Sequence, residues 1–182
     1  MREFLSFIWE TLKIVIVALA IVLPIRYFVF QPFIVKGESM EPNFQDGNYL
    51  IIDEISYRLR SPERGEVVVF KYPYNPSQRY IKRIIGLPEE TIEIKDQKIR
   101  IFGKTGQEMI LDENTYLPAD DLTIGNSKTI LKDDEFFVLG DNRLASSDSR
   151  IWGVLPRDKI IGRVLFRLWP PQEVSAITIP NY

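Results

Sequence analysis

The first thirty residues form the most apolar part of the chain. The stretch Ile14–Ile25 contains no charged residue, and apolar residues extend from it in both directions. A helix from about Phe7 to Phe30 would exceed the roughly 20 residues that cross a bilayer. Lys13 and Arg26 lie near the two ends of the uncharged stretch, where long cationic side chains reach lipid headgroups. The pattern predicts a membrane anchor over residues 1–30.

Three other interpretations fit this segment less well. A half-exposed core helix or an interfacial helix would need a clear polar face, and this segment is apolar on all faces. A cleaved signal peptide would need small residues at its end, whereas Ala18 and Ala20 lie inside the apolar stretch and bulky residues follow them. Cations flank both ends of the segment, so charge alone gives only a slight indication of its orientation.

Beyond residue 30 the pattern changes to short runs rich in Val, Ile, Phe and Tyr, separated by Gly, Pro, Asn and Asp. Such runs are typical of β-strands. Helical periodicity is confined to Glu54–Leu59. The predicted fold is therefore mainly β, with a single transmembrane helix before an extracytoplasmic sheet. The predicted strands are 31–36, 48–53, 66–72, 79–85, 91–95, 98–102, 108–111, 135–139 and 160–167.

Residues 89–134 are more polar and richer in turn signals than the segments on either side. This difference predicts a small inserted β subdomain over 89–134. Residues 31–88 and 135–182 would then form the main β core, which would be the catalytic one if the chain is an enzyme.

The composition excludes several kinds of active site. The 182 residues contain no Cys and no His, which rules out disulfides, thiolate or His-ligated metal sites and a Ser-His-Asp triad. We expect neither a metal nor a cofactor. The 23 basic and 25 acidic residues give a net charge of −2, which provides no electrostatic footprint for nucleic acid.

Ser39 lies in the turn GESMEP, directly after a predicted strand. A Ser bounded by Gly and Pro is exposed, and its backbone N–H can point into a site. Taken alone, however, such a Ser is more often one that caps its own backbone.

Lys82 and Arg83 are adjacent in the predicted strand RYIKRII. Alternation places one of these two cations on the apolar side of the sheet. Burial lowers the pKa of a lysine, and a neutral amine is a competent general base. The commoner alternative is an edge-strand lysine in water.

The segment GDNRLASSDSR, residues 140–150, follows another apolar strand. It combines two Asp, an Asn, two Arg and three Ser. Such a loop is either a solvated turn or a scaffold in which Arg–carboxylate pairs hold hydroxyl groups around a site. The density of polar groups slightly favours the scaffold.

In the absence of His, a Ser nucleophile needs another base, and Lys is the natural choice. Here the sequence resembles the bacterial type I signal peptidases, membrane-bound Ser/Lys endopeptidases. The resemblance covers the whole chain, and it is closest to the short form found in Gram-positive bacteria. After the N-terminal anchor, the motifs follow in the family's order: GESMEPNF, DGNYLIID, RGEVVVF, RYIKRIIGLP and GDNRLASSDSRIWG.

The resemblance implies a role for each matching residue. Ser39 would be the nucleophile and Lys82 the general base, with Ser146 orienting the lysine amine. Asp148 would pair with Arg150, with Arg83 nearby. Shallow apolar pockets for the substrate would be formed by Val35, Met40, Phe44, Tyr80 and Ile81.

The resemblance also implies the setting of the reaction. The N-terminus would be cytoplasmic, the plasma membrane would be crossed once, and the secretion translocase would be nearby. The substrates would be secretory preproteins with small residues at positions −3 and −1 of the cleavage site. Separately from the resemblance, we expect apolar residues near the site, Trp152 with Phe33, to contact membrane lipid.

Two departures from the family pattern are visible. Some members carry a hydroxyl two residues before the nucleophile, where this chain has Gly37, so a second oxyanion donor is not identified. A Gly commonly follows the Pro of the lysine motif, and here Glu89 stands in that place.

Other kinds of protein remain as alternatives. A self-cleaving Ser/Lys repressor would carry a DNA-binding domain where this chain has its apolar segment. A different membrane-bound processing peptidase would share the motifs but not the substrates. A non-catalytic β domain would commonly lack the Ser or the Lys.

Overall fold

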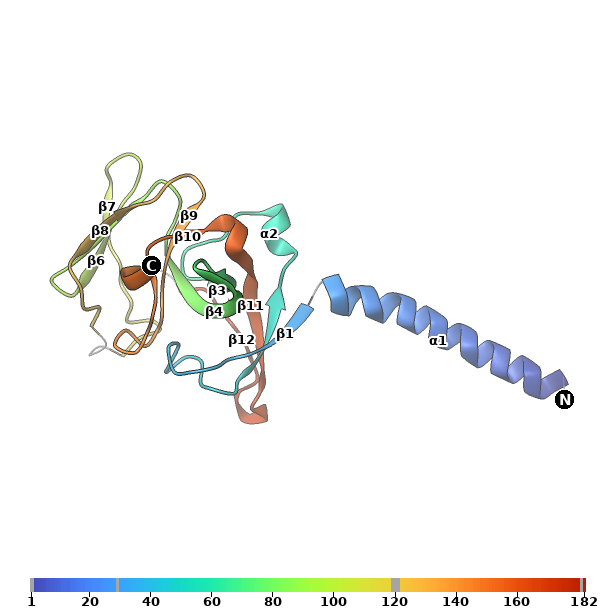
Figure 1. Cartoon of the computed structure of the whole chain (residues 1–182). Helices are drawn as coiled ribbons and strands as arrows, with labels where there is room; N and C mark the ends of the chain where they lie inside the picture. Colours follow the sequence, from blue (N-terminus) through green and yellow to red (C-terminus); the bar gives the residue numbers. More distant parts are fainter. Residues whose placement is uncertain (1, 29, 119–121, 181) are drawn as a thin grey trace.

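The computed structural model describes residues 2–28, 30–118, 122–180 and 182; the side chains of residues 2, 5 and 21–31 also lie outside the description. Helix α1 (Arg2–Phe28) extends away from a β body that contains the other described elements (Figure 1). Among the described residues, no helix is both long enough and apolar enough to cross a membrane. The membrane span predicted for the first thirty residues is therefore not confirmed.

The larger sheet is antiparallel and, within the described residues, has eight strands. Their spatial order is β1-β2-β11-β3-β4-β9-β10, and β12 pairs with β11. The strands are β1 (Phe30–Ile34), β2 (Tyr49–Asp53), β3 (Val67–Tyr72), β4 (Asn75–Gly86), β9 (Glu135–Leu139), β10 (Leu155–Pro156), β11 (Ile160–Trp169) and β12 (Ser175–Ala176).

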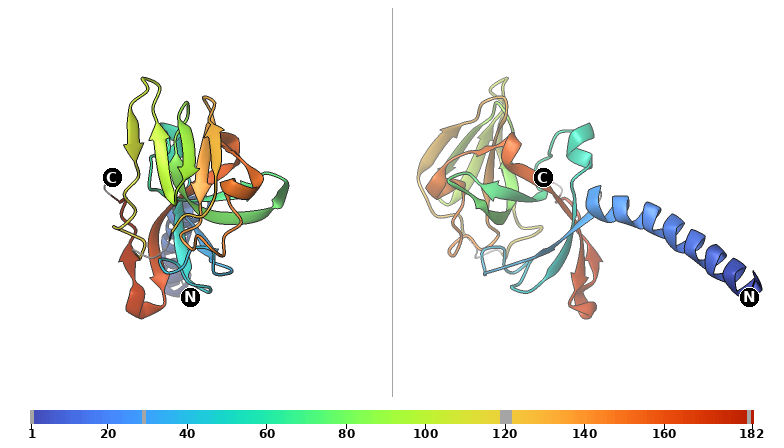
Figure 2. Two further views of the ribbon diagram at one scale, coloured as in Figure 1. Left: turned by 90° about the vertical axis from the view of Figure 1, so that its left-hand side faces the viewer. Right: turned by 45° about the vertical axis from the view of Figure 1, so that its right-hand side comes forward.

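A second antiparallel sheet is built from the middle of the chain. In the described residues it has four strands in the order β7-β6-β5-β8. They are β5 (Thr91–Lys95), β6 (Lys98–Phe102), β7 (Glu108–Ile110) and β8 (Ser127–Ile130). Figure 2 shows this sheet at the side of the body away from α1.

Short helical segments connect the strands. Helix α2 (Ser56–Leu59) lies within the predicted helical stretch 54–59, and α3 (Ser149–Trp152) follows the polar loop. Two 3-10 turns, η1 (Arg157–Lys159) and η2 (Pro171–Glu173), flank β11. All nine predicted strand segments contain strands, which confirms the mainly β class.

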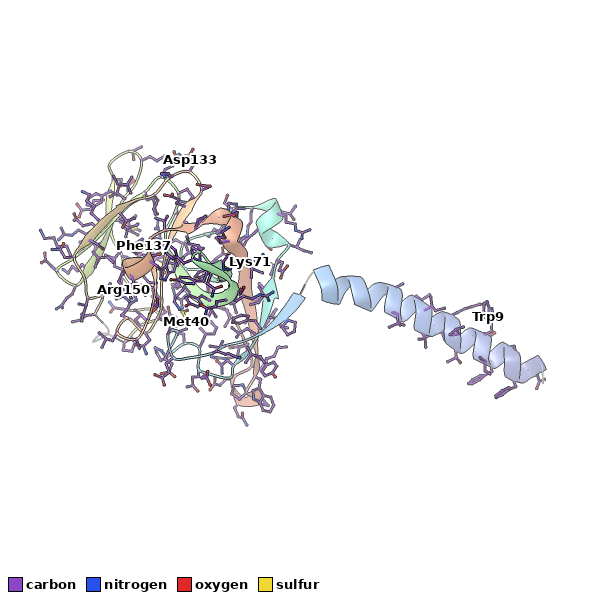
Figure 3. All side chains as sticks on the ribbon, in the orientation of Figure 1. Trp9, Met40, Lys71, Asp133, Phe137 and Arg150 are labelled. Atoms are coloured by element: carbon purple, nitrogen blue, oxygen red, sulfur yellow. The ribbon has the colours of Figure 1, made fainter. Side chains whose placement is uncertain are left out.

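Both faces of the second half of strand β4, from Ile81 to Gly86, are covered by apolar packing. Ile81 belongs to a buried cluster with Val35, Met40 and Phe44, while Ile84 and Ile85 belong to two other buried clusters. In Figure 3, Met40 lies within the body, whereas Trp9 projects from α1 far from it. A site residue on β4 is therefore enclosed from both sides.

The expected lipid contact of Trp152 is wrong. Its side chain is only 6% exposed, and it packs against Phe70 and Tyr72 with ring centroids 5.8 and 5.9 Å away. An indole enclosed in this way contributes to the core of the β body. Phe33 is partly buried against a separate apolar cluster.

Candidate active site

Ser39 and Lys82 meet although 43 residues separate them in the chain. Ser39 lies in the turn after β1, and Lys82 lies on β4. The Lys82 Nζ atom donates a hydrogen bond of 2.6 Å to Ser39 Oγ and another of 2.8 Å to the Ile81 carbonyl oxygen. A lysine amine and a serine hydroxyl are thus held at proton-transfer distance.

The Lys82 amine is enclosed, with 3% of the residue exposed. Strand β4 lies between β3 and β9, so the alternative of an edge-strand lysine in water is wrong. Burial lowers the pKa of Lys82 to about 8, although the charges of Asp148 and Asp141 act in the opposite direction. Half of Lys82 is therefore neutral near pH 8, and a neutral amine can accept a proton.

The turn around Ser39 is tight and well defined. The backbone N–H groups of Glu41 and Phe44 donate to the carbonyls of Glu38 and Met40, at 3.1 and 2.9 Å. The Ser39 carbonyl oxygen accepts a 3.1 Å hydrogen bond from the Asn142 backbone N–H. The turn and the loop 140–150 therefore share a direct backbone contact.

Two backbone N–H groups, those of Gly37 and Ser39, differ in whether they already have a hydrogen-bond acceptor. Gly37 has φ of 83°, and its N–H donates to Asp46 Oδ1 at 2.7 Å. Within the part of the chain that the structure describes, the Ser39 N–H has no hydrogen-bond acceptor. Of these two groups, only the Ser39 N–H is available to an anion.

The loop 140–150 is a scaffold of ion pairs, as its composition favours. Arg150 Nε and Nη2 donate to the two carboxylate oxygens of Asp148, each at 2.8 Å, and Nη2 also donates to the Arg143 carbonyl. Asp148 accepts the Gly140 backbone N–H at 3.1 Å as well. The predicted pairing of Asp148 with Arg150 is present.

Ser146 is buried in the same loop. Its Oγ has no hydrogen-bond partner among the described residues. It lies so close to Gly140 that a Cβ at that glycine would overlap it and the Ser39 carbonyl oxygen. Ser146 is therefore near the nucleophile turn, but it makes no hydrogen bond to Lys82.

Arg83 pairs with a residue that the sequence did not indicate. Its Nε and Nη2 donate to Asp141 at 2.9 and 2.6 Å, and its guanidinium carbon lies 4.2 Å from the Tyr116 ring centroid. Lys82 and Arg83 are both only 3% exposed, so the cation predicted on the apolar side of the sheet is buried and its neighbour on the opposite face is buried as well. The covering of both faces of β4 explains this burial.

A cleft of about 690 Å³ opens beside Ser39 and Lys82. Tyr80 and Ile81 line it, together with Phe33 from β1. Val35, Met40 and Phe44 lie in the adjacent apolar core, each no more than 1% exposed. Their assignment to the substrate pockets stays a prediction.

No three carboxylates among the described residues are placed to hold a metal ion. The groups that this site offers for chemistry are the serine, the lysine and backbone N–H groups. Together with the cleft, these groups form a site suited to acyl transfer, the reaction class of serine peptidases.

Comparison with known proteins assigns the chain to a family. Residues 8–169 match the family described as signal peptidase, peptidase S26. A probable signal peptidase I-2 of Synechocystis sp. is 40% identical over 171 residues, 91% of this chain and 75% of the relative. Signal peptidase IB of Staphylococcus aureus is 36% identical over 168 residues, 86% of this chain and 87% of the relative.

The crystal structure of a signal peptidase I from Enterococcus faecalis is 28% identical, with a TM-score of 0.47; it matches 57% of this chain and 97% of its own. By the family match over residues 8–169 and the identity to the Synechocystis and Staphylococcus relatives, the chain belongs to the signal peptidases of family S26, which are membrane-associated. Its activity is that of a signal peptidase I, which removes signal peptides from preproteins.

Proposed function

We propose that the chain cleaves preproteins with Ser39 as nucleophile and Lys82 as general base. The observation that carries this proposal is the 2.6 Å hydrogen bond from the buried Lys82 amine to Ser39 Oγ. The lowered pKa of Lys82, about 8, supports it because a base works best near the ambient pH.

In the proposed reaction, neutral Lys82 removes the hydroxyl proton of Ser39 as its Oγ attacks the scissile carbonyl carbon. The tetrahedral intermediate collapses when the C–N bond breaks, and the Lys82 ammonium gives its proton to the leaving amine of the mature protein. A water molecule, deprotonated by Lys82, then attacks the acyl ester. This step releases the signal peptide with a new carboxylate and regenerates both side chains.

The oxyanion of each tetrahedral intermediate requires hydrogen-bond donors. The Ser39 backbone N–H supports this role because it has no acceptor among the described residues. The Gly37 N–H is less suitable, since it already donates to Asp46. We therefore assign one donor to Ser39.

The remaining predicted residues have supporting roles in this proposal. Asp148 with Arg150 would hold the loop 140–150, and Arg83 would hold β4, so that Ser146 is kept near the Ser39 turn. Tyr80 and Ile81 at the cleft, with Val35, Met40 and Phe44 behind them, would form shallow pockets. Such pockets accept small residues at positions −3 and −1 of the cleavage site.

The second sheet supports the proposed division of the chain. All four of its strands lie between residues 91 and 130. We therefore propose 89–134 as an inserted subdomain and 31–88 with 135–182 as the catalytic core.

We further propose that residues 1–30 anchor the protein in the plasma membrane, with the N-terminus in the cytoplasm, the β body outside and the translocase nearby. Large apolar side chains on the described part of α1 are exposed, as expected for contact with lipid. A row of exposed residues across β1, β2 and β11, namely Ile34, Tyr49 and Trp169, supports contact of the body with lipid.

The experiment that tests the Ser/Lys mechanism uses the full chain in detergent with a preprotein that carries an Ala-x-Ala site. We expect cleavage after the second Ala by the parent protein and none by Ser39→Ala or Lys82→Ala. Cleavage that persists in Lys82→Ala would remove the proposed base. The proposed orientation, with the N-terminus in the cytoplasm and the β body outside, is tested separately. The full chain, with α1 intact, is placed in sealed vesicles and exposed to a protease.

A further inference from the structure

The turn that carries Ser39 is attached to the loop 140–150 at two points. At its start, the Ser39 carbonyl oxygen accepts from the Asn142 backbone N–H at 3.1 Å. Toward its end, Asn43 Nδ2 donates to Asp141 Oδ2 at 2.8 Å. A single hydrogen bond would allow the turn to pivot, and two separated ones fix its orientation.

Asn43 is chemically suited to this position. Its Nδ2 also donates to the Tyr116 carbonyl oxygen at 2.8 Å. Both partners are acceptors without a hydrogen to give, and an amide nitrogen supplies two hydrogens. Both donors of Asn43 are therefore used, and an aspartate in its place would have none at neutral pH.

The partner of Asn43 leads back to the lysine strand. Asp141 is held by Arg83 through hydrogen bonds of 2.9 and 2.6 Å. Arg83 directly follows Lys82 on β4. Tyr116, whose carbonyl accepts from Asn43, packs its ring 4.2 Å from the Arg83 guanidinium carbon. Directional contacts thus run from the serine turn to the lysine strand.

Arg167 Nη1 also donates to the Asn43 backbone carbonyl oxygen at 2.8 Å, a bond that does not involve the Asn43 side chain. The apolar contacts of the turn do not have this directionality. Met40 and Phe44 bury their side chains in the apolar cluster that also contains Ile81. Apolar packing is not directional, so it limits the position of the turn more than its orientation.

We propose that Asn43 is a positioning residue, which acts through Asp141 and Arg83 to hold Ser39 Oγ at hydrogen-bonding distance from Lys82 Nζ. This inference rests on the proposed roles of Ser39 and Lys82. A displacement of about 1 Å in a reacting group can cost roughly 100-fold in rate. We therefore expect the loss of the Asn43 side chain to slow the chemical step.

The test compares Asn43→Ala and Asn43→Asp with the parent protein by steady-state cleavage of a preprotein. We expect kcat to fall about 10-fold or more in Asn43→Ala, with KM within about 2-fold. Asn43→Asp should lose more, because it keeps the shape of the amide but places a carboxylate beside that of Asp141.

Asn48→Ala is the matched control. Asn48 lies in the same connection between β1 and β2 and is 2% exposed, and its Oδ1 accepts from the Gln45 N–H at 3.1 Å. It makes no described hydrogen bond to Asp141 or Tyr116. We expect a lower unfolding temperature in Asn48→Ala but a kcat within about 2-fold of the parent.

The outcomes separate the two proposals. A folded Asn43→Ala with parental kcat, a change confined to KM, or an equal loss in Asn48→Ala would overturn the positioning role. Cleavage by Ser39→Ala, measured beside them, would instead overturn the proposed nucleophile. Each variant is assayed below its own unfolding midpoint, and if Asn43→Ala does not fold, Asn43→Ser is judged by the same criteria.

Discussion

Arg83 and Asp141 form a two-bonded ion pair that is almost completely removed from solvent. The side chains are 4% and 0% exposed, and the two N–O distances are 2.9 and 2.6 Å. The Arg83 guanidinium also donates to the Gly65 carbonyl oxygen at 2.9 Å. Buried charges require this degree of compensation, since an unpaired ion in the interior is strongly unfavourable.

Asp141→Ala should therefore be severely destabilising. The substitution leaves the Arg83 charge buried without its partner, which typically lowers the free energy of unfolding by about 3–5 kcal/mol. Urea or thermal unfolding of the full chain in detergent measures the difference. Asp158→Ala is a suitable control, because Asp158 pairs with Lys159 but its side chain is 69% exposed. If both variants lose the same stability, the buried pair has no special role.

The rate of cleavage should rise with pH through about 8. Lys82 is the proposed base, its pKa is lowered to about 8 by burial, and only its neutral form accepts a proton. Because the neutral fraction increases as pH rises through that pKa, kcat/KM should follow the same curve. Initial rates with a preprotein at subsaturating concentration give the profile. A rising limb near the ordinary lysine value of 10.5 would show that burial does not tune this amine.

Strand patterns in the sequence predicted most of the fold because Val, Ile, Phe and Tyr concentrate in paired strands. The three strands that were not predicted, β8, β10 and β12, are only 4, 2 and 2 residues long. Strands this short carry too few residues for alternation to be visible. Strand β4 begins at Asn75, earlier than predicted, because its start pairs with β3 in a hairpin.

The candidate site was less predictable than the fold. The motifs identified Ser39, Lys82 and the loop 140–150, and the structure brings these together. The sequence did not predict that Asp141 and Tyr116 contact Arg83, although Asp141 lies in the motif GDNRLASSDSR. These contacts depend on the tertiary arrangement of two loops that are distant from Arg83 in the sequence. No local sequence pattern predicts that arrangement.

Lys82→Met should stabilise the protein at pH 6. Below about 8 the folded protein holds a buried ammonium, whereas the unfolded chain binds the same proton in water with a pKa of 10.5. This difference in pKa corresponds to about 3 kcal/mol in the free energy of unfolding. We expect Lys82→Met to raise the free energy of unfolding by about 1–3 kcal/mol.

The stabilisation by Lys82→Met depends on pH. Between about 8 and 10.5 the unfolded chain binds more protons than the folded one, so the parent gains stability as pH rises. The advantage of Lys82→Met should therefore shrink across this window. Chemical unfolding of both proteins at pH 6 and pH 10 measures it, and a constant difference would argue against a lowered lysine pKa.

Gly140→Ala should disrupt the site from a position that carries no reactive group. A Cβ at Gly140 would overlap Ser146 Oγ and the Ser39 carbonyl oxygen, and because the second of these is a backbone atom, the Ser39 turn itself would have to shift. Overpacking of this kind costs about 1–3 kcal/mol in stability. We also expect kcat to fall by about 100-fold, because the Ser39 turn must move.

Gly103→Ala provides the comparison for this substitution. A Cβ at Gly103 meets nothing closer than the Gln107 carbonyl oxygen at 3.9 Å, an ordinary contact. Cleavage rates and unfolding midpoints of the two variants should therefore separate clearly, with Gly103→Ala close to the parent. Parental activity in Gly140→Ala would mean that the close approach of Gly140 to Ser39 does not constrain the nucleophile.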